Sequence, residues 1–572
     1  MARSLAWQPH MRVFWAATVG FCTTFFSVFA PAALGPYMKM KKADGGLGLT
    51  KDESSLAGNL AVTGTILMRV GAGPMCDKIG VRKTFVLLLT IAIPGIICLM
   101  AAQGATAFIM GRIIVGLSLA TFVTCQVWCS QFFSSSIVGT VNATAGGWGN
   151  LGGGITLLVM PRIMDAFLSL TETSMTPASS IDTSWRLCFI VPLVLHVISA
   201  LFVWTGRDLP DGSYKQLEDA GVKQKSKDQG GGFNLVKVGF SNTNALILLL
   251  TYGCCFGVEL TMNNKLVAYF NQYYALSPSN ASTLGATFSL MNLFARSWGG
   301  LLSDWADKHF GMRGRITSMW VCQTLCGLCC LFLGVVTVAK SSPDDEQFKG
   351  MAKVQGIYEH DNGLDELVYY FNGTGGLVEK CGSAFVRSPY YGIVNGETMR
   401  WPKKEGERVM IYDPDPECIH NGSTLGITMI LIIVFSIFVQ MSEGLHFGIV
   451  PKVSRPALGV VSGMVGAGGN FGALISGQFI IGSGTKAPFD EGFIYLGIII
   501  MCLTLTHFLL FFPGEGGMLL PKDFPYDPQW IKPLTDAKGA DEIDFSAHAG
   551  KAYERGKVSK ATDDISSTTS VA

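Results

Sequence analysis

The sequence places two arginines inside apolar runs, where a charged side chain is costly. Arg69 lies in the run 56–76, and Arg296 lies in the run 283–303. A charge at the centre of a membrane costs about 2.5–3.5 kcal/mol on insertion scales, so such residues are candidates for function. The two guanidinium groups would repel each other without an anion between them, and their parallel N–H donors suit a planar oxyanion. The alternative is that each arginine pairs with a nearby acid or a backbone carbonyl.

Each arginine belongs to a repeated pattern. The segments RVGAGPMCD (69–77) and RSWGGLLSD (296–304) share Arg, Gly and Asp at equal spacing, which aligns Asp77 with Asp304. A second pair, GGWGNLGGG (146–154) and GAGGNFGAL (466–474), aligns Asn150 with Asn470. Internal repeats of this kind predict two halves of similar structure, which would place the arginines on either side of the interface between them.

The two asparagines stand among glycines in otherwise apolar runs. A side-chain amide beside bare backbone can donate hydrogen bonds to an anion, although the amides can equally bond one helix to another. The first segment also matches G-x-G-x-x-G, but this motif indicates a nucleotide only between a strand and a helix of a βαβ unit. No such unit surrounds it. We therefore expect no nucleotide, cofactor, metal or enzyme activity; a nucleotide-dependent membrane enzyme is the alternative that this motif leaves.

Acidic residues in the apolar runs are candidates for carrying protons. Glu259 lies in the seventh run, and Glu443 and His446 lie at the predicted inner end of the tenth. A low-dielectric environment favours the protonated form of a carboxyl group. Uptake of an anion against an inside-negative potential needs such cotransport, at about 2.3 kcal/mol per charge per 100 mV. The alternatives are that Glu259 pairs with Lys265 or makes a polar helix contact, that Glu443 is structural, and that His446 is solvated or interhelical.

The composition predicts the elements that hold these residues. The chain is 49% hydrophobic and 15% charged, against about 25% charged in soluble proteins, and its net charge of +1 gives no reason to expect nucleic acid. A membrane span needs about 20 mostly apolar residues. Twelve runs qualify, so we predict an all-α polytopic membrane protein with spans near 13–36, 56–76, 84–103, 107–130, 141–165, 185–205, 243–268, 283–303, 315–339, 424–446, 458–483 and 492–512.

Lysine and arginine in the short loops predict the orientation. They are more frequent on the side that carries the chain termini, so both termini are expected in the cytoplasm. The predicted parts are an N-terminal half of six helices (1–205), a cytoplasmic linker (206–240), helices seven to nine (241–339), an outer insert (340–423), helices ten to twelve (424–512) and a disordered cytoplasmic tail (513–572).

The segments predicted to lie on the outer side contain candidate glycosylation sites and two cysteines. Three glycosylation sequons begin at Asn280, Asn372 and Asn421, and the last two lie in the insert. Cys381 and Cys418 also lie in the insert, where a disulfide or two free thiols are both possible.

The residues GPMCDKIGVRK (73–83) resemble the loop motif of the Major Facilitator Superfamily between its second and third helices. The resemblance implies two six-helix halves and a gate latch on the cytoplasmic side. Its motif positions here are Gly73, Asp77, Gly80 and Arg82, with Asp304 as the equivalent acid of the second half.

The glycine-rich segments and the two arginine segments are similar to the nitrate/nitrite porter family, as are TYGCCFGVELTMNN (251–264) and EGLHFGIVPKVSRPALGVVSGM (443–464). The resemblance implies that Arg69 and Arg296 clamp nitrate. It implies that Asn150 and Asn470, with the adjoining backbone of Gly149 and Gly469, complete the site, and by looser analogy that Tyr252 and Phe256 wall it. The long insert departs from the usual pattern of the family.

We therefore expect a proton-coupled importer of nitrate, and of nitrite as a further substrate, that works by alternating access in the plasma membrane. A nitrate/nitrite exchanger needs no titrating carboxylate and is the first alternative. A membrane sensor that binds nitrate and signals through its tail is the second. The resemblance also raises a single-span accessory membrane protein as a partner.

Overall fold

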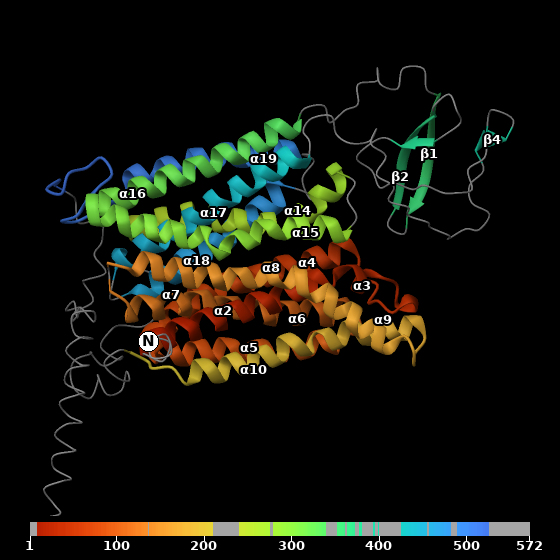
Figure 1. The fold of residues 1–572 in the computed structure, drawn as a ribbon, viewed down its shortest axis with the longest axis horizontal. Helices are drawn as coiled ribbons and strands as arrows, with labels where there is room; N and C mark the ends of the chain where they lie inside the picture. Colours follow the sequence, from red (N-terminus) through yellow and green to blue (C-terminus); the bar gives the residue numbers. More distant parts are fainter. Residues whose placement is uncertain are drawn as a thin grey trace, which may run out of the picture.

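The computed structural model describes residues 9–134, 136–209, 239–274, 278–338, 425–454, 457–481 and 489–525, and five strands between residues 352 and 399. The described chain is dominated by helices that form two packed groups, one from each half of the sequence (Figure 1). This agrees with the predicted all-α polytopic fold.

The N-terminal half runs from residue 9 to residue 204. The helix Lys51–Ile79 is preceded by Thr50, which forms a capping box with Glu53 and so fixes the start of this helix. The helices of this half are α2 (Pro9–Ala33), α3 (Gly35–Lys39), α4 (Lys51–Ile79), α5 (Val81–Met100), α6 (Ala105–Leu117), α7 (Thr121–Phe132), α8 (Val138–Thr171), α9 (Pro177–Cys188) and α10 (Ile190–Trp204), with 3₁₀ turns η1 (Lys42–Asp44) and η2 (Ser118–Ala120).

The C-terminal half repeats this pattern with more breaks. Several of its spans are divided by short irregular turns, and one of these turns ends at Leu293, just before the helix that carries Arg296. Its elements are α13 (Thr243–Gly253), α14 (Phe256–Tyr274), α15 (Pro278–Leu290), η3 (Met291–Leu293), α16 (Ala295–Val338), α17 (Leu425–Val453), α18 (Leu458–Ile475), the π-helix η5 (Ser476–Ile480), α19 (Phe489–Thr504) and η6 (Leu505–Leu509).

Ten helical stretches of the described residues are long and apolar enough to cross a membrane. Helix α4, which carries Arg69, is not among them, and the stretch Asn280–Thr337 counts once. This stretch contains a break at Gly311, whose φ of 62° is a conformation that glycine adopts without steric cost. The predicted total of twelve spans therefore stays a prediction.

The described strands lie outside the helical bundle in sequence. In the insert they are β1 (Ala352–His360), β2 (Gly363–Phe371), β3 (Leu377–Glu379), β4 (Ile393–Val394) and β5 (Thr398–Met399), paired antiparallel in the order β1-β2-β3 and as β4-β5. The last two strands, β6 (Phe511–Phe512) and β7 (Gly516–Gly517), form a short antiparallel pair. The prediction of a disordered tail from residue 513 is therefore wrong at its start, because backbone pairing and the contact of Arg313 with the carbonyl of Gly517 extend the ordered chain.

The two halves meet along pairs of facing helices (Figure 1). Helix α4 packs on α18, and α8 packs on α16. Glycines allow this close approach: a Cβ at Gly73 would lie 2.5 Å from the carbonyl oxygen of Gly459, and a Cβ at Gly300 would lie 2.4 Å from that of Gly139. The glycine-rich segments thus serve the packing of helices across the interface.

Candidate functional site

Both arginines are completely buried at the interface between the halves. Arg69 projects from the continuous helix α4, whereas Arg296 lies in the first turn of α16, just after the non-helical Phe294 (φ −135°). The guanidinium carbon of Arg69 lies 4.8 Å from the ring centroid of Phe122, and that of Arg296 lies 5.7 Å from the same centroid. The two charges thus converge on one aromatic ring of α7.

Arg69 is held by backbone carbonyls of both halves. It donates hydrogen bonds to the carbonyl of Gly466 at 2.6 Å and to that of Leu119 at 3.4 Å, and its Nε has no hydrogen-bond partner among the described residues. A second aromatic ring, that of Phe256, lies 5.0 Å from its guanidinium carbon. A carbonyl neutralises no charge, so Arg69 remains an uncompensated cation in a desolvated site.

Arg296 has an acidic partner. It forms an ion pair with Glu443 of α17, and its other terminal nitrogen donates to the hydroxyl of Tyr252 at 3.0 Å. Both members of the ion pair are completely buried. The contacts that the sequence left as the alternative to anion binding, a carbonyl for one arginine and an acid for the other, are thus both present in this structure.

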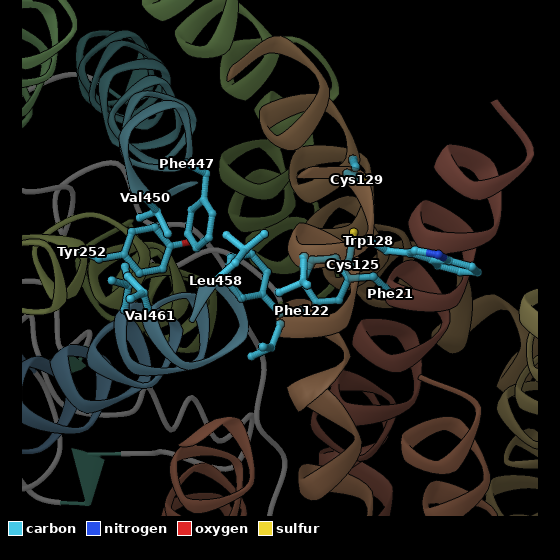
Figure 2. Packing of buried hydrophobic residues seen from close by; sticks show 14 of the residues in the cluster. Phe21, Phe122, Cys125, Trp128, Cys129, Tyr252, Phe447, Val450, Leu458 and Val461 are labelled. Carbon is cyan, nitrogen blue, oxygen red and sulfur yellow. The ribbon is translucent and has the colours of Figure 1, made fainter. Parts of the chain in front are cut away.

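Aromatic rings enclose the space around the two arginines. The rings of Tyr252 and Phe256 stack on each other at 5.4 Å and on Phe122 at 6.1 and 5.8 Å, while Phe447 meets Phe122 edge-on at 4.9 Å. Figure 2 shows Phe122 between the two halves, with Tyr252 and Phe447 on the side of the second half. The analogy that named Tyr252 and Phe256 missed Phe122 and Phe447, since a single Phe among 36 carries no distinguishing spacing.

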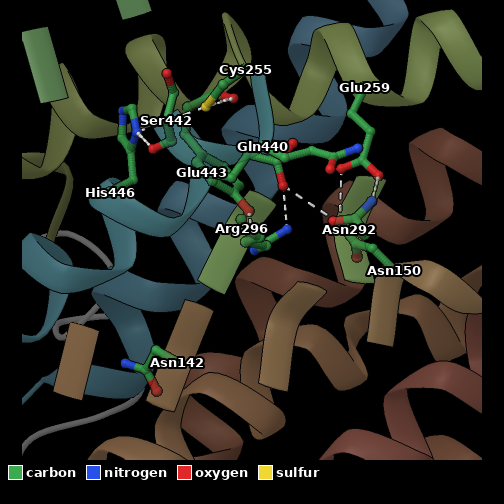
Figure 3. Close-up of polar contacts among 12 residues, drawn as sticks. Asn142, Asn150, Cys255, Glu259, Asn292, Arg296, Gln440, Ser442, Glu443 and His446 are labelled. Carbon is green, nitrogen blue, oxygen red and sulfur yellow. Dashed lines mark hydrogen bonds and ion pairs between the residues drawn. The ribbon is translucent and has the colours of Figure 1, made fainter. Parts of the chain in front are cut away.

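The two buried carboxylates share one amide. Asn150 donates from its side-chain nitrogen to Glu259 at 2.9 Å and to Glu443 at 3.5 Å, and Asn292 donates to the other oxygen of Glu259 at 2.5 Å (Figure 3). Among the described residues no ion pair joins Glu259 to Lys265; the bonds from Asn150 and Asn292 are instead the polar helix contact that the sequence left as the other alternative. Glu259, Asn150, Glu443 and Arg296 form one connected polar network, which we call the acidic network.

The two asparagines are not equivalent. The side-chain nitrogen of Asn150 donates to carboxylates of other helices, which is the alternative to anion binding that the sequence analysis gave for this amide. Gly149 beside it packs against Phe21. Asn470 is completely buried, and neither polar atom of its side chain has a hydrogen-bond partner among the described residues. Its neighbour Gly469 packs closely on the rings of Tyr252 and Phe256. Asn470 is therefore the asparagine whose amide has unused hydrogen-bonding capacity.

The G-x-G-x-x-G match lies inside helix α8, with no strand beside it. Its glycines make room for neighbouring side chains: a Cβ at Gly146 would lie 2.9 Å from a terminal nitrogen of Arg296. The segment is therefore part of a membrane helix, as predicted, and its glycines are explained by the approach of the arginine and of α2.

Of the predicted gate residues, Gly73, Asp77 and Asp304 lie where the halves touch, whereas Arg82 contacts the end of its own half. Gly80, at φ 95°, ends α4 and begins α5, and Arg82 forms an ion pair with Asp208 at 2.7 Å. Asp77 lies at the start of α18, because a Cβ at Gly459 would stand 2.8 Å from its carboxylate.

Asp304 occupies the matching place in the other half. Its carboxylate accepts hydrogen bonds from the backbone N–H of Gly139 at 3.1 Å and from the N–H and hydroxyl of Thr140 at 2.7 Å, and it pairs with Arg315 at 3.0 Å. Each acid thus faces the N-terminal end of a helix of the opposite half, where the helix dipole favours a negative charge.

The opposite end of the interface is also closed. The side chain of Gln478 donates to that of Asn59 at 2.6 Å across the halves, and a Cβ at Gly154 would lie 2.9 Å from the Cβ of Ser289. Because both ends are packed, the arginines between them are shielded from solvent on either side.

The sequence predicted that Glu443 and His446 lie at the end of their helix, and this prediction is wrong. Helix α17 continues to Val453, with Pro451 tolerated in its last turn, so both residues occupy its interior. His446 contacts the carbonyl of Ser442 at 2.7 Å and the hydroxyl of Thr251 at 3.0 Å, which makes it interhelical and not solvated.

Five other predicted positions bear on the outer surface. Asn280 is exposed, in the first turn of α15 instead of a loop. The remaining four lie outside the described residues: Asn372, Asn421, Cys381 and Cys418.

Comparisons with known proteins place this geometry in a family. Residues 19–343 match the family described as Major Facilitator Superfamily. The chain is 36% identical to "Nitrate transporter 2.1" of Chlamydomonas reinhardtii, over 90% of this chain and 76% of that one, and 32% identical to "High-affinity nitrate transporter 2.3" of Oryza sativa subsp. japonica, over 90% and 80%. Among solved structures, the transporter FucP in its outward conformation has a TM-score of 0.53 at 11% identity, covering 87% of this chain and 98% of that chain, which shows the shared fold.

Proposed function

We propose that this chain, which belongs to the Major Facilitator Superfamily and within it to the family of eukaryotic high-affinity nitrate transporters, imports nitrate together with protons. The relatives are named nitrate transporters, which supports the substrate. The observation that carries the mechanism is the convergence of the buried Arg69 and Arg296 on Phe122, with only Arg296 compensated by an acid.

Nitrate lies between the two guanidinium groups in this proposal. The anion replaces the carbonyl of Gly466 on Arg69 and the carboxylate of Glu443 on Arg296, so that both arginine forks face its oxygens. The free amide of Asn470 supplies a further donor, and the ring of Phe122 matches the planar face of the ion. Nitrite offers the same planar charge with one oxygen fewer, so the same site admits it more weakly.

Displacement of Glu443 provides the coupling to protons. A buried carboxylate that loses its cationic partner is strongly destabilised unless it takes up a proton. Asn150 holds Glu443 and Glu259 within reach of one amide nitrogen, so the two acids feel each other's charge. One proton on Glu443 balances one nitrate, and a second proton on Glu259 makes the loaded carrier net positive, as uptake into a negative interior requires.

Alternating access follows from the two closed ends of the interface. The contacts of Asp77 and Asp304 with the opposite half hold the predicted cytoplasmic end, and the Asn59–Gln478 contact holds the other end. Opening one set while the other stays closed exposes the arginines to one side at a time. We place the protein in the plasma membrane, and the distribution of Lys and Arg favours a cytoplasmic location for both termini. An accessory single-span membrane protein is a candidate partner.

The test is transport by the purified chain in liposomes. An imposed inward proton gradient should drive nitrate accumulation, and the Arg69→Lys variant should keep the fold and the charge but lose at least tenfold in nitrate affinity, because a single ammonium cannot form the fork. Normal affinity in this variant would refute the clamp. Nitrate/nitrite counter-exchange without proton influx would establish an exchanger, and binding without flux would establish a sensor.

A further inference from the structure

Two buried histidines of the C-terminal half lie beside the acidic network and take no part in binding nitrate in the mechanism proposed above. His446 lies on α17, and His507 lies on η6 at the end of the last span. Both are completely buried, and their ring centroids lie 5.9 Å apart. Imidazole is the side chain that changes its protonation most readily near neutral pH, so a buried pair of histidines is a candidate for carrying protons.

His446 is linked to the site through Tyr252 and through its place on α17. It follows Glu443 by three positions on the same helix, a spacing that places two side chains on one face (Figure 3). Its ring lies 5.5 Å from that of Tyr252, which in turn bonds Arg296. One ring nitrogen of His446 contacts the carbonyl of Ser442, and the other contacts the hydroxyl of Thr251, which can donate or accept a hydrogen bond. Both ring nitrogens therefore have polar partners.

His507 has no such partners. Neither of its ring nitrogens has a hydrogen-bond partner among the described residues, although the ring is completely buried. Leaving a polar group buried and unbonded costs about 1–3 kcal/mol, so a purely structural role would be served better by an apolar side chain. The chain turns into β6 four residues later, where Asn244 bonds the backbone of Phe511 at the predicted cytoplasmic end of the bundle.

We propose that His446 and His507 carry the transported proton from Glu443 to the cytoplasmic side. This rests on the proposed proton-coupled function. The proton leaves the carboxyl group of Glu443, adds to His446, and passes through a water molecule or a small ring rotation to His507, which releases it to solvent. Both histidines return to neutrality, and Glu443 regains its charge and its pairing with Arg296. The titratable and charged groups around His446 are Tyr252, Cys255, Glu443 and Arg296.

The experiment separates net transport from exchange in liposomes that contain the full chain. Net nitrate uptake and proton influx are driven by an inward proton gradient. Exchange of labelled nitrate is measured with nitrate on both sides and no gradient; it requires no proton release, since the loaded carrier can cycle with its proton in place. His507→Gln and His507→Leu should lower net uptake and proton influx at least tenfold and leave exchange within about twofold.

His196 offers a matched control in the other half. It is also completely buried, and its nitrogens contact the carbonyl of Leu89 at 3.0 Å and the hydroxyl of Ser27 at 2.9 Å, so it copies the bonding of His446 away from any acid of the network. His196→Gln should change net uptake and exchange in equal proportion. Unchanged net uptake in both His507 variants, or equal loss of uptake and exchange in both, would overturn the relay. Nitrate uptake without proton influx in the unaltered chain would instead overturn the proposed function itself, and the relay with it.

Discussion

The Arg296–Glu443 ion pair makes the sharpest prediction, because removing its negative charge should tighten nitrate binding. Glu443→Gln keeps the size of the side chain and an oxygen for Arg296 but removes the compensating charge. Breaking a buried pair from one side costs about 3–5 kcal/mol, since the remaining charge is uncompensated. The variant should therefore be less stable than the unaltered protein when no anion is present.

Nitrate then supplies the missing charge. If the anion recovers only about 1.4 kcal/mol of that cost, its affinity rises about tenfold. The pH dependence should change as well. The proposed mechanism couples nitrate binding to proton uptake by Glu443, so the affinity of the unaltered protein for nitrate should improve as pH falls, by up to about tenfold per unit for one proton. In Glu443→Gln this slope should flatten.

Thermal unfolding in detergent, titrated with nitrate at several pH values, measures both effects. Saturation to about 100 times Kd stabilises a protein by about 2.7 kcal/mol, which is easily resolved. Chloride at equal ionic strength controls for salt. Glu259→Gln is the matched variant, since Glu259 is also a buried acid but is held by the amides of Asn150 and Asn292 instead of an arginine. It should leave nitrate affinity near that of the unaltered protein and reduce only the pH dependence of uptake.

The opposite sign would refute the reasoning. If Glu443→Gln binds nitrate more weakly than the unaltered protein, Glu443 supports the clamp and does not compete with the anion. If its affinity and pH slope are both unchanged, Glu443 has no part in coupling, and the proton must be carried elsewhere.

Three further predictions concern the packing and the unused amide. Gly463→Ala should destabilise the protein by about 1–3 kcal/mol and slow uptake, because the new Cβ would lie 2.5 Å from the carbonyl oxygen of Arg69, whereas Gly71→Ala meets open space and should do neither; melting temperature and initial uptake rate measure this. Asp304→Asn should weaken the closed contact with α8 by about 1–2 kcal/mol, seen as about five- to thirtyfold faster amide exchange in the first turn of that helix, and unchanged exchange would contradict the latch. Asn470→Ala should weaken nitrate binding about two- to tenfold without lowering the melting temperature, since the amide has no partner to lose in the protein alone, and a lowered melting temperature with intact binding would count against its place in the site.

The sequence predicted the charged centre of the site because its signal is energetic. An arginine inside an apolar run is so costly that Arg69 and Arg296 stand out without any structure, and the repeated spacing around them indicates that they belong together. The helices could be predicted equally well, because apolar runs can be recognised from local composition alone. The same logic failed for the start of the tail, where the β6–β7 pair is contacted by Arg313 of the distant helix α16.

The partners of the arginines could not be predicted in this way. Glu443 was assigned to a helix end because the apolar run was taken to end at residue 446, yet α17 continues through Pro451 to Val453. The predicted end of this helix was thus about two turns too early. For this reason the sequence placed Glu443 near a loop, whereas in the structure it is the buried partner of Arg296. Phe122 escaped prediction for a different reason: an aromatic residue in an apolar helix is unremarkable until the fold brings both arginines to its ring.

The charges of the site explain why its two arginines need different partners. With Glu259 and Glu443 ionised and no nitrate, two positive and two negative side chains sum to zero, so the empty carrier returns across the membrane without work against the potential. Nitrate with one proton is again neutral, and nitrate with two protons is positive. An acid on both arginines would leave neither fork free for the anion, and an acid on neither would leave two repelling cations in the empty protein. In the proposed mechanism the carbonyl-bound Arg69 therefore gives nitrate its first contact, and the Glu443-bound Arg296 makes the second contact conditional on a proton. In the proposed cycle the membrane potential acts on the loaded carrier and not on the neutral empty carrier, so an inside-negative potential should accelerate net nitrate uptake wherever the loaded step limits the rate.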